Sequence, residues 1–183
     1  MTEWIMNFDF SVLTLIQAHV KCAFLDVLMP FLSSLGAHGE IWIVWALVLC
    51  CWRKYRKEGV CILVGLLLGL LLGNLLLKNL IARPRPCWLN PDVPLLVPIP
   101  DDFSFPSGHT LSSFIAAFLL AKTDRKFGAV AIPLACLMAF SRLYLYVHFP
   151  TDIIGGFLLA AAIAYAVWQG KKQWEKKRKN SSV

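Results

Sequence analysis

Apolar residues fill six long segments of the chain, and short polar stretches separate them. The segments are residues 8–36, 39–53, 58–82, 107–121, 127–146 and 150–169. A helix needs about 20 apolar residues to cross a bilayer, so the second and fourth segments are short for a span. The first contains Lys21, Asp26 and Pro30 and fits either one span or an amphipathic surface helix followed by a short span. This pattern predicts an all-α integral membrane protein, a bundle of six transmembrane helices.

The composition agrees with a chain that lies in a bilayer. Hydrophobic residues make up 58% of the 183 residues and charged residues 16%, whereas soluble domains average about 45 to 50% and about 25%. Disordered chains, collagen-like fibres, disulfide scaffolds and ordinary cytosolic enzymes all need more polar surface than this. The six cysteines follow neither a disulfide framework nor a metal-binding spacing. The length suits one domain, residues 1–183, of which 170–183 form a basic tail.

Basic residues give the chain a net charge of +7 and cluster in three runs, at 53–57, 122–126 and 171–179. Each run ends an apolar segment, which is the positive-inside pattern of membrane loops and argues against a nucleic-acid partner. If all three runs face the cytoplasm, the chain crosses six times, both termini lie inside, and residues 87–105 lie outside. We therefore expect a multi-pass protein of the plasma or inner membrane.

The outer stretch 87–105, called the flap below, contains four residue-proline pairs that forbid a regular helix. We expect its apolar residues to rest on the bilayer surface; these are Leu95, Leu96, Val97 and Ile99. Asp101 and Asp102 either guard the entrance of a site or cap the approaching loop. Interfacial anchors are expected near the span ends, at Trp4, Trp42, Trp52, Trp88, Trp168 and Trp174.

Ionisable residues gather at the outer ends of the predicted spans, on one side of the membrane in this topology. They are Lys78, Arg83, Arg85, His109, Arg142, His148 and Asp152. A charge next to hydrocarbon is costly unless it is paired or functional. A convergence of cations and imidazoles with one carboxylate suits a phosphate-like dianion. The alternative is that each side chain snorkels separately and holds a helix end at the interface.

Two spacings favour the phosphate site. His148 and Asp152 are four residues apart, so on a helix they share one face, and the carboxylate can accept the Nδ1 proton of the imidazole. The Nε2 atom is then an oriented nucleophile. In residues 106–109, proline suits the first helical position, Gly108 lets a ligand approach the backbone, and free amides point at an anion. We predict a phosphate cradle with a proton donor, His109, beside it.

Three motifs stand in order along the chain: Lys78-x6-Arg85-Pro86, Pro106-Ser107-Gly108-His109 and Ser141-Arg142-x5-His148-x3-Asp152. Together they resemble the three-part signature of the type 2 phosphatidic acid phosphatase superfamily, at the family's internal spacings. The match covers residues 78–152, under half of the chain. Vanadium haloperoxidases share the signature, but they are soluble, whereas this composition is that of a membrane protein.

The resemblance implies a metal-independent hydrolase that needs no cofactor. His148 would attack phosphorus and carry a phosphohistidine, and Asp152 would hold its ring and stabilise the positive charge that develops. His109 would protonate the leaving oxygen and then activate water. The phosphate oxygens would be bound by Lys78, Arg85, Arg142, Ser107 and the Gly108 amide.

The resemblance also implies a lipid substrate that reaches the site sideways from the bilayer, at the outer membrane-water interface. This chain is similar to the short bacterial members of the family, many of which dephosphorylate undecaprenyl diphosphate, and this is the substrate we expect. Phosphatidylglycerophosphate and phosphatidate are the alternative substrates. From another class, the alternative is a catalytically silent membrane protein that binds lipid phosphate. The oligomeric state stays open.

Five other residues could belong to the site or have only a structural role. Arg83 lies within the first motif but outside its matched positions, and it either touches phosphate or anchors the helix end. Tyr144 and Tyr146 are either interfacial aromatics or part of the pocket wall. His19 and His38 have no partner at chemical spacing, so we interpret them as structural or interfacial.

Overall fold

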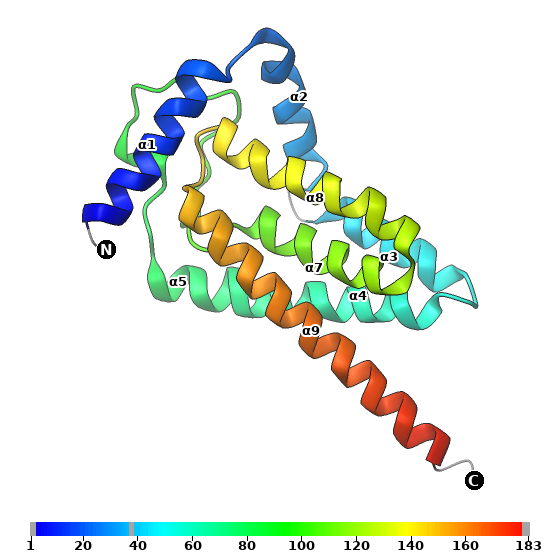
Figure 1. The fold of residues 1–183 in the computed structure, drawn as a ribbon. Coiled ribbons are helices and arrows are strands. Elements are labelled where there is room, and N and C mark those ends of the chain that lie inside the picture. The colour runs from blue at the N-terminus through cyan, green and yellow to red at the C-terminus, as the bar shows by residue number, and fades with distance from the viewer. Residues whose placement is uncertain (1–2, 37–38, 181–183) are drawn as a thin grey trace.

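The apolar segments of the sequence form helices that pack side by side, so the all-α prediction is confirmed (Figure 1). The computed structural model describes residues 3–36 and 39–180, and these ranges contain no strand. In chain order the elements are α1 (Glu3–His19), α2 (Ala23–Ser34), α3 (Glu40–Cys51), α4 (Arg56–Gly69), the π-helix η1 (Leu70–Leu77), α5 (Lys78–Ile81), α6 (Pro86–Leu89), α7 (Gly108–Thr123), α8 (Arg125–Tyr144) and α9 (Pro150–Asn180). His38 lies outside the described residues.

The helix boundaries differ from the apolar segments at both ends of the chain. The first segment divides into α1 and α2, because the chain leaves the helix at residues 20–22. Two helices therefore occupy a stretch that also fitted a single span. The last helix, α9, continues beyond residue 169 to Asn180, so the basic tail is helical as far as the structure describes it. Between these ends, α4, η1 and α5 follow one another without a break.

Helix α7 lies in the middle of the bundle, beside α4, α8 and α9 (Figure 1). Its Leu111, Ile115 and Leu120 are buried in the main hydrophobic core. Helix α4 approaches α7 closely because it presents glycines to it. A Cβ atom on Gly65 or Gly69 would lie 2.8 or 2.7 Å from the Ile115 side chain, and small residues at such positions let helix backbones come together. This contact sets α5, which follows on the same helical stretch, near the start of α7.

A second hydrophobic cluster joins α1 and α2 to the loop between α8 and α9. Leu13 of α1 and Met29 of α2 pack there with Val147 and Phe149 of the loop, and all four are buried. The loop that carries the third motif is therefore supported from behind by the two N-terminal helices. Figure 1 shows α1 and α2 on that side of the bundle.

The flap is mostly irregular, as its prolines predicted, although its first residues belong to the single turn of α6. Leu95 and Val97 pack against the second hydrophobic cluster. Leu96 and Ile99 are exposed. That the flap rests on the bilayer surface stays a prediction, for which Leu96 and Ile99 are the exposed apolar side chains.

One predicted interfacial tryptophan is a core residue instead. Trp42 is fully buried, and its indole Nε1–H donates to Ser113 Oγ on α7 over 2.9 Å. A buried tryptophan needs a partner of this kind for its N–H group. By contrast, Trp4, Trp52 and Trp174 are exposed. The place of Trp42 near the start of an apolar segment did not reveal its role, because the partner lies on another helix.

Three helical stretches within the described residues are long and apolar enough to cross a membrane, namely Arg56–Leu89, Arg125–Tyr144 and Pro150–Asn180. The parts that carry the basic runs lie together: Lys171 Nζ is 2.6 Å from Glu58 Oε1, and the ring centroids of Tyr55 and Phe127 are 5.4 Å apart. The start of α7, the end of α8 and the start of α9 meet at the opposite end of the bundle (Figure 1). The fold thus separates a basic end from the end that holds the motif residues.

Candidate active site

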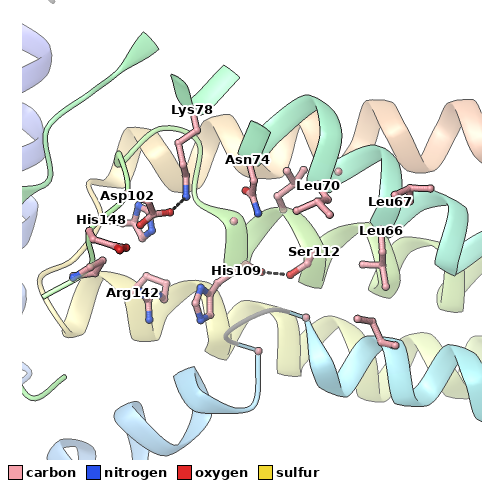
Figure 2. A pocket seen from close by; sticks show the side chains of 18 of the residues that line it. Leu66, Leu67, Leu70, Asn74, Lys78, Asp102, His109, Ser112, Arg142 and His148 are labelled. Atoms are coloured by element: carbon pink, nitrogen blue, oxygen red, sulfur yellow. Dashed lines mark hydrogen bonds and ion pairs between the residues drawn. The ribbon is translucent and has the colours of Figure 1, made fainter. Parts of the chain in front are cut away.

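Six of the eight site residues identified from the sequence line one cavity of about 700 Å³ (Figure 2). They are Lys78, Arg85, Gly108, His109, Arg142 and His148. These residues come from α5 and the stretch after it, the start of α7, the last turn of α8, and the loop before α9. The other two, Ser107 and Asp152, are fully buried and do not line the cavity.

The loop between α8 and α9 presents His148 in a way that differs from the helical pair that its spacing predicted. Asp152 lies in the first turn of α9, but His148 precedes this helix, which begins at Pro150. The chain turns through Tyr146, whose φ of 60° is in the left-handed region. Such a conformation costs about 1 to 3 kcal/mol and is found most often at functional sites. His148 still meets the carboxylate, with Nδ1 3.5 Å from Asp152 Oδ2.

The hydroxyl of Ser104 lies between His148 and Asp152. Its Oγ donates to Asp152 Oδ2 at 2.5 Å and lies 3.4 Å from His148 Nδ1. The Phe149 amide donates to the same carboxylate oxygen at 2.8 Å. These partners replace the water that the fully buried Asp152 has lost. The imidazole is therefore held on its Nδ1 side by fixed polar groups.

The other ring nitrogen of His148 faces Arg85. Arg85 Nη1 lies 3.1 Å from Nε2 and also donates to the Val147 carbonyl at 2.6 Å. A guanidinium only donates, so Nε2 accepts and the ring proton is on Nδ1, toward Asp152. Burial and the charge of Arg85 lower the pKa of His148 well below its usual range. The ring is therefore neutral at pH 7, and the electron pair of Nε2, which here accepts from Arg85, is on the cavity side.

A carboxylate from the flap, that of Asp102, binds two cations of the cavity, and Figure 2 shows its contact with one of them, Lys78. Asp102 Oδ2 accepts from Lys78 Nζ, its Oδ1 accepts from Arg85 Nη2 at 2.5 Å, and its carbonyl accepts from Arg85 Nε at 2.6 Å. Burial alone would raise the pKa of Asp102, but the hydrogen bonds and charges of Lys78 and Arg85 lower it to about 2. The sequence left two roles open for Asp102, at the entrance of a site or as a cap of the loop. Its contacts with Lys78 and Arg85 support the role at the site. An anion must displace Asp102 to reach both cations.

Ser33, near the end of α2, contacts two predicted site residues of the cavity, Arg142 and His109. Arg142 Nη1 donates to Ser33 Oγ, and the Ser33 carbonyl is 3.1 Å from His109 Nε2. A carbonyl only accepts, so Nε2 of His109 carries a proton in this contact. The Nε–H group of Arg142 is buried and has no partner among the described residues. Arg142 therefore has a donor to spare for a bound anion.

The start of α7 differs from the predicted cradle in the place of Ser107. Its Oγ caps the helix, accepting from the Thr110 amide at 3.4 Å and the Thr110 hydroxyl at 3.0 Å. Gly108 does line the cavity, and a Cβ atom there would lie 2.9 Å from Asn74 Oδ1. Asn74, on η1, also lines the cavity, and its Oδ1 is buried without a partner in the described part of the chain. The helix start thus offers its backbone to the cavity, while Ser107 fixes the cap.

Arg83 is neither a cavity residue nor an interfacial anchor, so both interpretations of it are wrong. It is 4% exposed and donates from Nη1 to Asp152 Oδ1 and from Nη2 to Asp9 Oδ2, both at 2.5 Å. Its guanidinium also lies over the ring of Phe149, 4.1 Å from the centroid. The site therefore includes a buried ion-pair cluster that reaches α1.

The tyrosines of the third motif are also buried, so the interfacial interpretation is wrong for Tyr144 and Tyr146. The Tyr144 hydroxyl donates to Asp26 Oδ1 at 2.7 Å and thereby ties α8 to α2. The amide of Asn90 in the flap lies 3.5 Å from the Tyr146 hydroxyl. His19 is exposed at the end of α1, in keeping with the structural or interfacial role predicted for it.

Four residues of the site lie outside the three sequence motifs and were not predicted, namely Asp9, Ser33, Asn74 and Ser104. Asp9 and Asn74 carried a signal, because an isolated polar residue in an apolar helix needs a partner or a function. Ser33 and Ser104 carried none, since serine is common and small. For all four, the partners lie on other helices or loops, and only the tertiary structure reveals them.

Comparisons with known proteins agree with this geometry. Residues 58–176 match the model of the PAP2 superfamily. The chain is 34% identical to the undecaprenyl-diphosphatase of Sulfolobus acidocaldarius, over 79% of this chain and 70% of that protein. It is 33% identical to the decaprenylphosphoryl-5-phosphoribose phosphatase of Mycolicibacterium smegmatis, over 68% of this chain and 67% of that protein. The crystal structure of a PAP2-type phosphatidylglycerolphosphate phosphatase from Bacillus subtilis has a TM-score of 0.77 and 27% identity, covering 94% of this chain and 88% of that one.

Replacement of Asp102 tests its hold on the two cations. Asp102→Asn keeps the size of the side chain and removes its charge, so Lys78 and Arg85 become available to an anion. We expect inorganic phosphate to bind about 10-fold more tightly, since one charge-assisted hydrogen bond contributes about 1.5 to 3 kcal/mol. Isothermal titration of the purified protein with phosphate measures this. Asp101→Asn is the control, because it removes the same charge without touching the contacts of Asp102. Equal affinities in the two variants would contradict the interpretation.

Proposed function

The chain belongs to the PAP2 superfamily and is a phosphatase, and we propose that its substrate is a membrane lipid phosphate or diphosphate. Among these we favour undecaprenyl diphosphate, which would be hydrolysed to undecaprenyl phosphate and phosphate. Similarity to an undecaprenyl-diphosphatase at 34% identity supports this choice. The main evidence for a lipid substrate is the shape of the cavity, in which a cluster of cations adjoins an apolar arm.

The apolar arm of the cavity runs from the cations toward α3 and α4. Its wall contains Ile43, Leu63, Leu66, Leu67 and Leu70. Leu67 and Leu70 are 55% and 46% exposed, so the arm opens at the side of the bundle, where lipid would lie. A lipid can place its phosphate among the cations while its chain leaves sideways along these leucines. A water-soluble phosphate ester would have no use for such an arm.

In the first chemical step, the substrate phosphate displaces Asp102 and binds Lys78, Arg85 and Arg142. Their charges stabilise the phosphate oxygens as negative charge spreads over them in the transition state. As Arg85 Nη1 turns from His148 Nε2 to the phosphate, Nε2 attacks phosphorus, the N–P bond forms, and the bond to the leaving oxygen breaks. His109, protonated on both ring nitrogens beside the phosphate anion, gives its Nδ1 proton to that oxygen and keeps Nε2–H on the Ser33 carbonyl. With undecaprenyl diphosphate, the leaving group is undecaprenyl phosphate.

In the second step, water attacks the phosphorus of the phosphohistidine while His109 takes its proton. The N–P bond breaks and inorganic phosphate is released. Asp152 stabilises the positive charge of the His148 ring in both steps through its contacts on the Nδ1 side. The Gly108 amide points at the phosphate from the start of α7, and the cap made by Ser107 fixes that amide. The cations take the part that metal ions play in metal-dependent phosphatases, so the reaction needs no metal.

Phosphatidylglycerophosphate is the second candidate substrate. The TM-score of 0.77 to a phosphatidylglycerolphosphate phosphatase favours it, and phosphatidate offers the same terminal phosphate on a lipid. A silent lipid-phosphate-binding protein would need the cations but not the acid and the nucleophile. This chain has His109, His148 and Asp152 in place. We therefore favour an enzyme over a binding protein.

We also propose a single membrane domain, residues 1–183, whose basic loops and C-terminus lie in the cytoplasm and whose site faces outward from the plasma or inner membrane; the expected six spans and cytoplasmic N-terminus do not fit the position of α1 beside the site. Three stretches reach spanning length on their own. Helices α3 and α7 would supply two more. The pair α1 and α2 does not supply a sixth, because Asp9 of α1 and Ser33 of α2 both contact residues at the site end of the bundle. The separation of the basic end from the site supports this orientation, because basic loops stay in the cytoplasm.

Phosphate release by the purified protein in detergent with EDTA tests the reaction. We expect undecaprenyl diphosphate to give a higher kcat/KM than phosphatidylglycerophosphate and phosphatidate. His148→Ala removes the nucleophile and should lower kcat by about 1,000-fold or more. His19→Ala is the matched control, because it removes an exposed histidine of α1 and should leave kcat unchanged.

The outcomes of this assay separate the alternatives. A clear preference for phosphatidylglycerophosphate would replace the substrate but keep the mechanism. A requirement for a divalent metal, or release by His148→Ala at the wild-type rate, would contradict the mechanism. No release from any of the three lipids by folded protein would favour the silent binding protein.

Labelling of two native cysteines tests the orientation. Cys22 and Cys51 are both exposed; the Cys22 amide donates to the Tyr144 hydroxyl near the site, and Cys51 adjoins the first basic run. In cells that express single-cysteine variants, we expect a membrane-impermeant maleimide to label Cys22 without permeabilisation and Cys51 only after it. The reverse pattern would invert the proposed orientation. Labelling of both in intact cells would exclude it.

A further inference from the structure

A cluster of buried charges continues behind His148, away from the cavity. Asp9, Arg83 and Asp152 are 0%, 4% and 0% exposed, and none of them lines the cavity. Resting on the proposed function, we infer that Arg83 and Asp9 are positioning residues of the hydrolysis. Through Asp152 they hold the His148 ring in the tautomer that leaves Nε2 free to attack phosphorus.

Arg83 holds Asp152 by the carboxylate oxygen that His148 does not use. Arg83 Nη1 donates to Oδ1 at 2.5 Å, whereas Oδ2 is the oxygen that lies 3.5 Å from His148 Nδ1. The two oxygens have separate partners, so the carboxylate cannot rotate without breaking one set. The guanidinium is itself fixed, because it lies 4.1 Å from the centroid of Phe149 and Nη1 also donates to Thr151 Oγ1 at 2.7 Å.

Asp9 completes the cluster from α1. Its Oδ2 accepts from Arg83 Nη2 at 2.5 Å and from Thr151 Oγ1 at 2.6 Å, and its Oδ1 accepts from the Thr151 amide at 3.1 Å. It therefore joins Arg83 to the first turn of α9, where Asp152 lies. Asp9 stands outside residues 58–176, the part that matches the family model. The N-terminal helix thus contributes to the reaction and does more than cover the bundle.

The balance of charge explains why both residues are needed. Two carboxylates and one guanidinium leave a single negative charge toward His148, which favours the positive ring of a phosphohistidine. Without Arg83, two carboxylates would be buried without a counter-ion, and one would take up a proton. Without Asp9, Arg83 alone would neutralise Asp152. Either change weakens the hold of Asp152 on the Nδ1 proton.

Two variants of the cluster and one matched control test the inference. Asp9→Asn and Arg83→Gln each remove one charge. Gln17→Leu removes another contact of α1, the hydrogen bond from Gln17 Nε2 to the Tyr144 carbonyl at 2.9 Å, and leaves the cluster intact. Arg83→Lys keeps the charge, but a single ammonium cannot reproduce the fork that reaches both carboxylates.

The readouts are the tautomer of His148, measured by nitrogen NMR of histidine-labelled protein in detergent, and kcat and KM for lipid phosphate release. The chain has four histidines, and His148→Ala assigns the signal. We expect the wild-type ring proton on Nδ1 and mixed tautomers in Asp9→Asn and Arg83→Gln. In both variants kcat should fall about 10-fold or more while KM stays within about twofold. Arg83→Lys should be intermediate, and Gln17→Leu should match the wild type.

A wild-type tautomer and wild-type kcat per folded molecule in Asp9→Asn and Arg83→Lys would overturn the inference. A lower midpoint of thermal unfolding in these variants would then mean a structural role only. If the wild-type protein releases no phosphate from any lipid, the proposed function fails, and the tautomer alone decides whether the cluster positions His148. If Arg83→Gln does not fold, Asp9→Asn and Arg83→Lys carry the test.

Discussion

Every part of the site depends on the burial of one carboxylate. Asp152 is 0% exposed, and a buried carboxylate stays charged only where hydrogen-bond donors or a counter-ion replace water. Here the donors are Arg83, Ser104 and the Phe149 amide, which come from three separate stretches of the chain. To satisfy this one group, the end of α5, the flap and the loop before α9 must converge. The same convergence brings His148 to the carboxylate and, two residues after Arg83, brings Arg85 to His148.

The convergence also brings several cations together in the cavity, and their mutual repulsion must be offset. Lys78 and Arg85 would repel each other, but in this structure Asp102 lies on both. Binding of a phosphate is therefore an exchange of one anion for another, in which the Asp102 carboxylate leaves its two cations. Glycines of α4 let α7 pack closely against it, which keeps the start of α7 beside η1. Leucines on another side of α4 and at the start of η1 form the wall of the apolar arm. The packing that holds the site together thus also forms the path for a lipid chain.

The sequence predicted which residues meet in the cavity far better than it predicted the side chains that support them. Motif residues such as Lys78, His109 and His148 could be identified because the chemistry needs fixed residue types at fixed spacings, and the apolar segments placed them at one level of the bundle. The pairing of Arg83 with Asp9 could not be predicted, because the two residues are 74 apart in the sequence and only packing of α1 brings them together. Burial of Trp42 was missed for the same reason. The place of His148 in a loop was missed because a spacing of four residues fits a helix equally well.

The mechanism requires that His148 form a bond to phosphorus during the reaction. The most direct test is a single turnover of undecaprenyl diphosphate by the His109→Ala variant, stopped in alkali, which preserves phosphohistidine, and followed by mass spectrometry of the peptides. Loss of His109 slows attack by water more than departure of undecaprenyl phosphate, so the intermediate should accumulate. The mechanism predicts a phosphoryl group on the peptide that contains His148 and on no other. Formation of product with no phosphorylated peptide, or with the phosphoryl group on another residue, would contradict it.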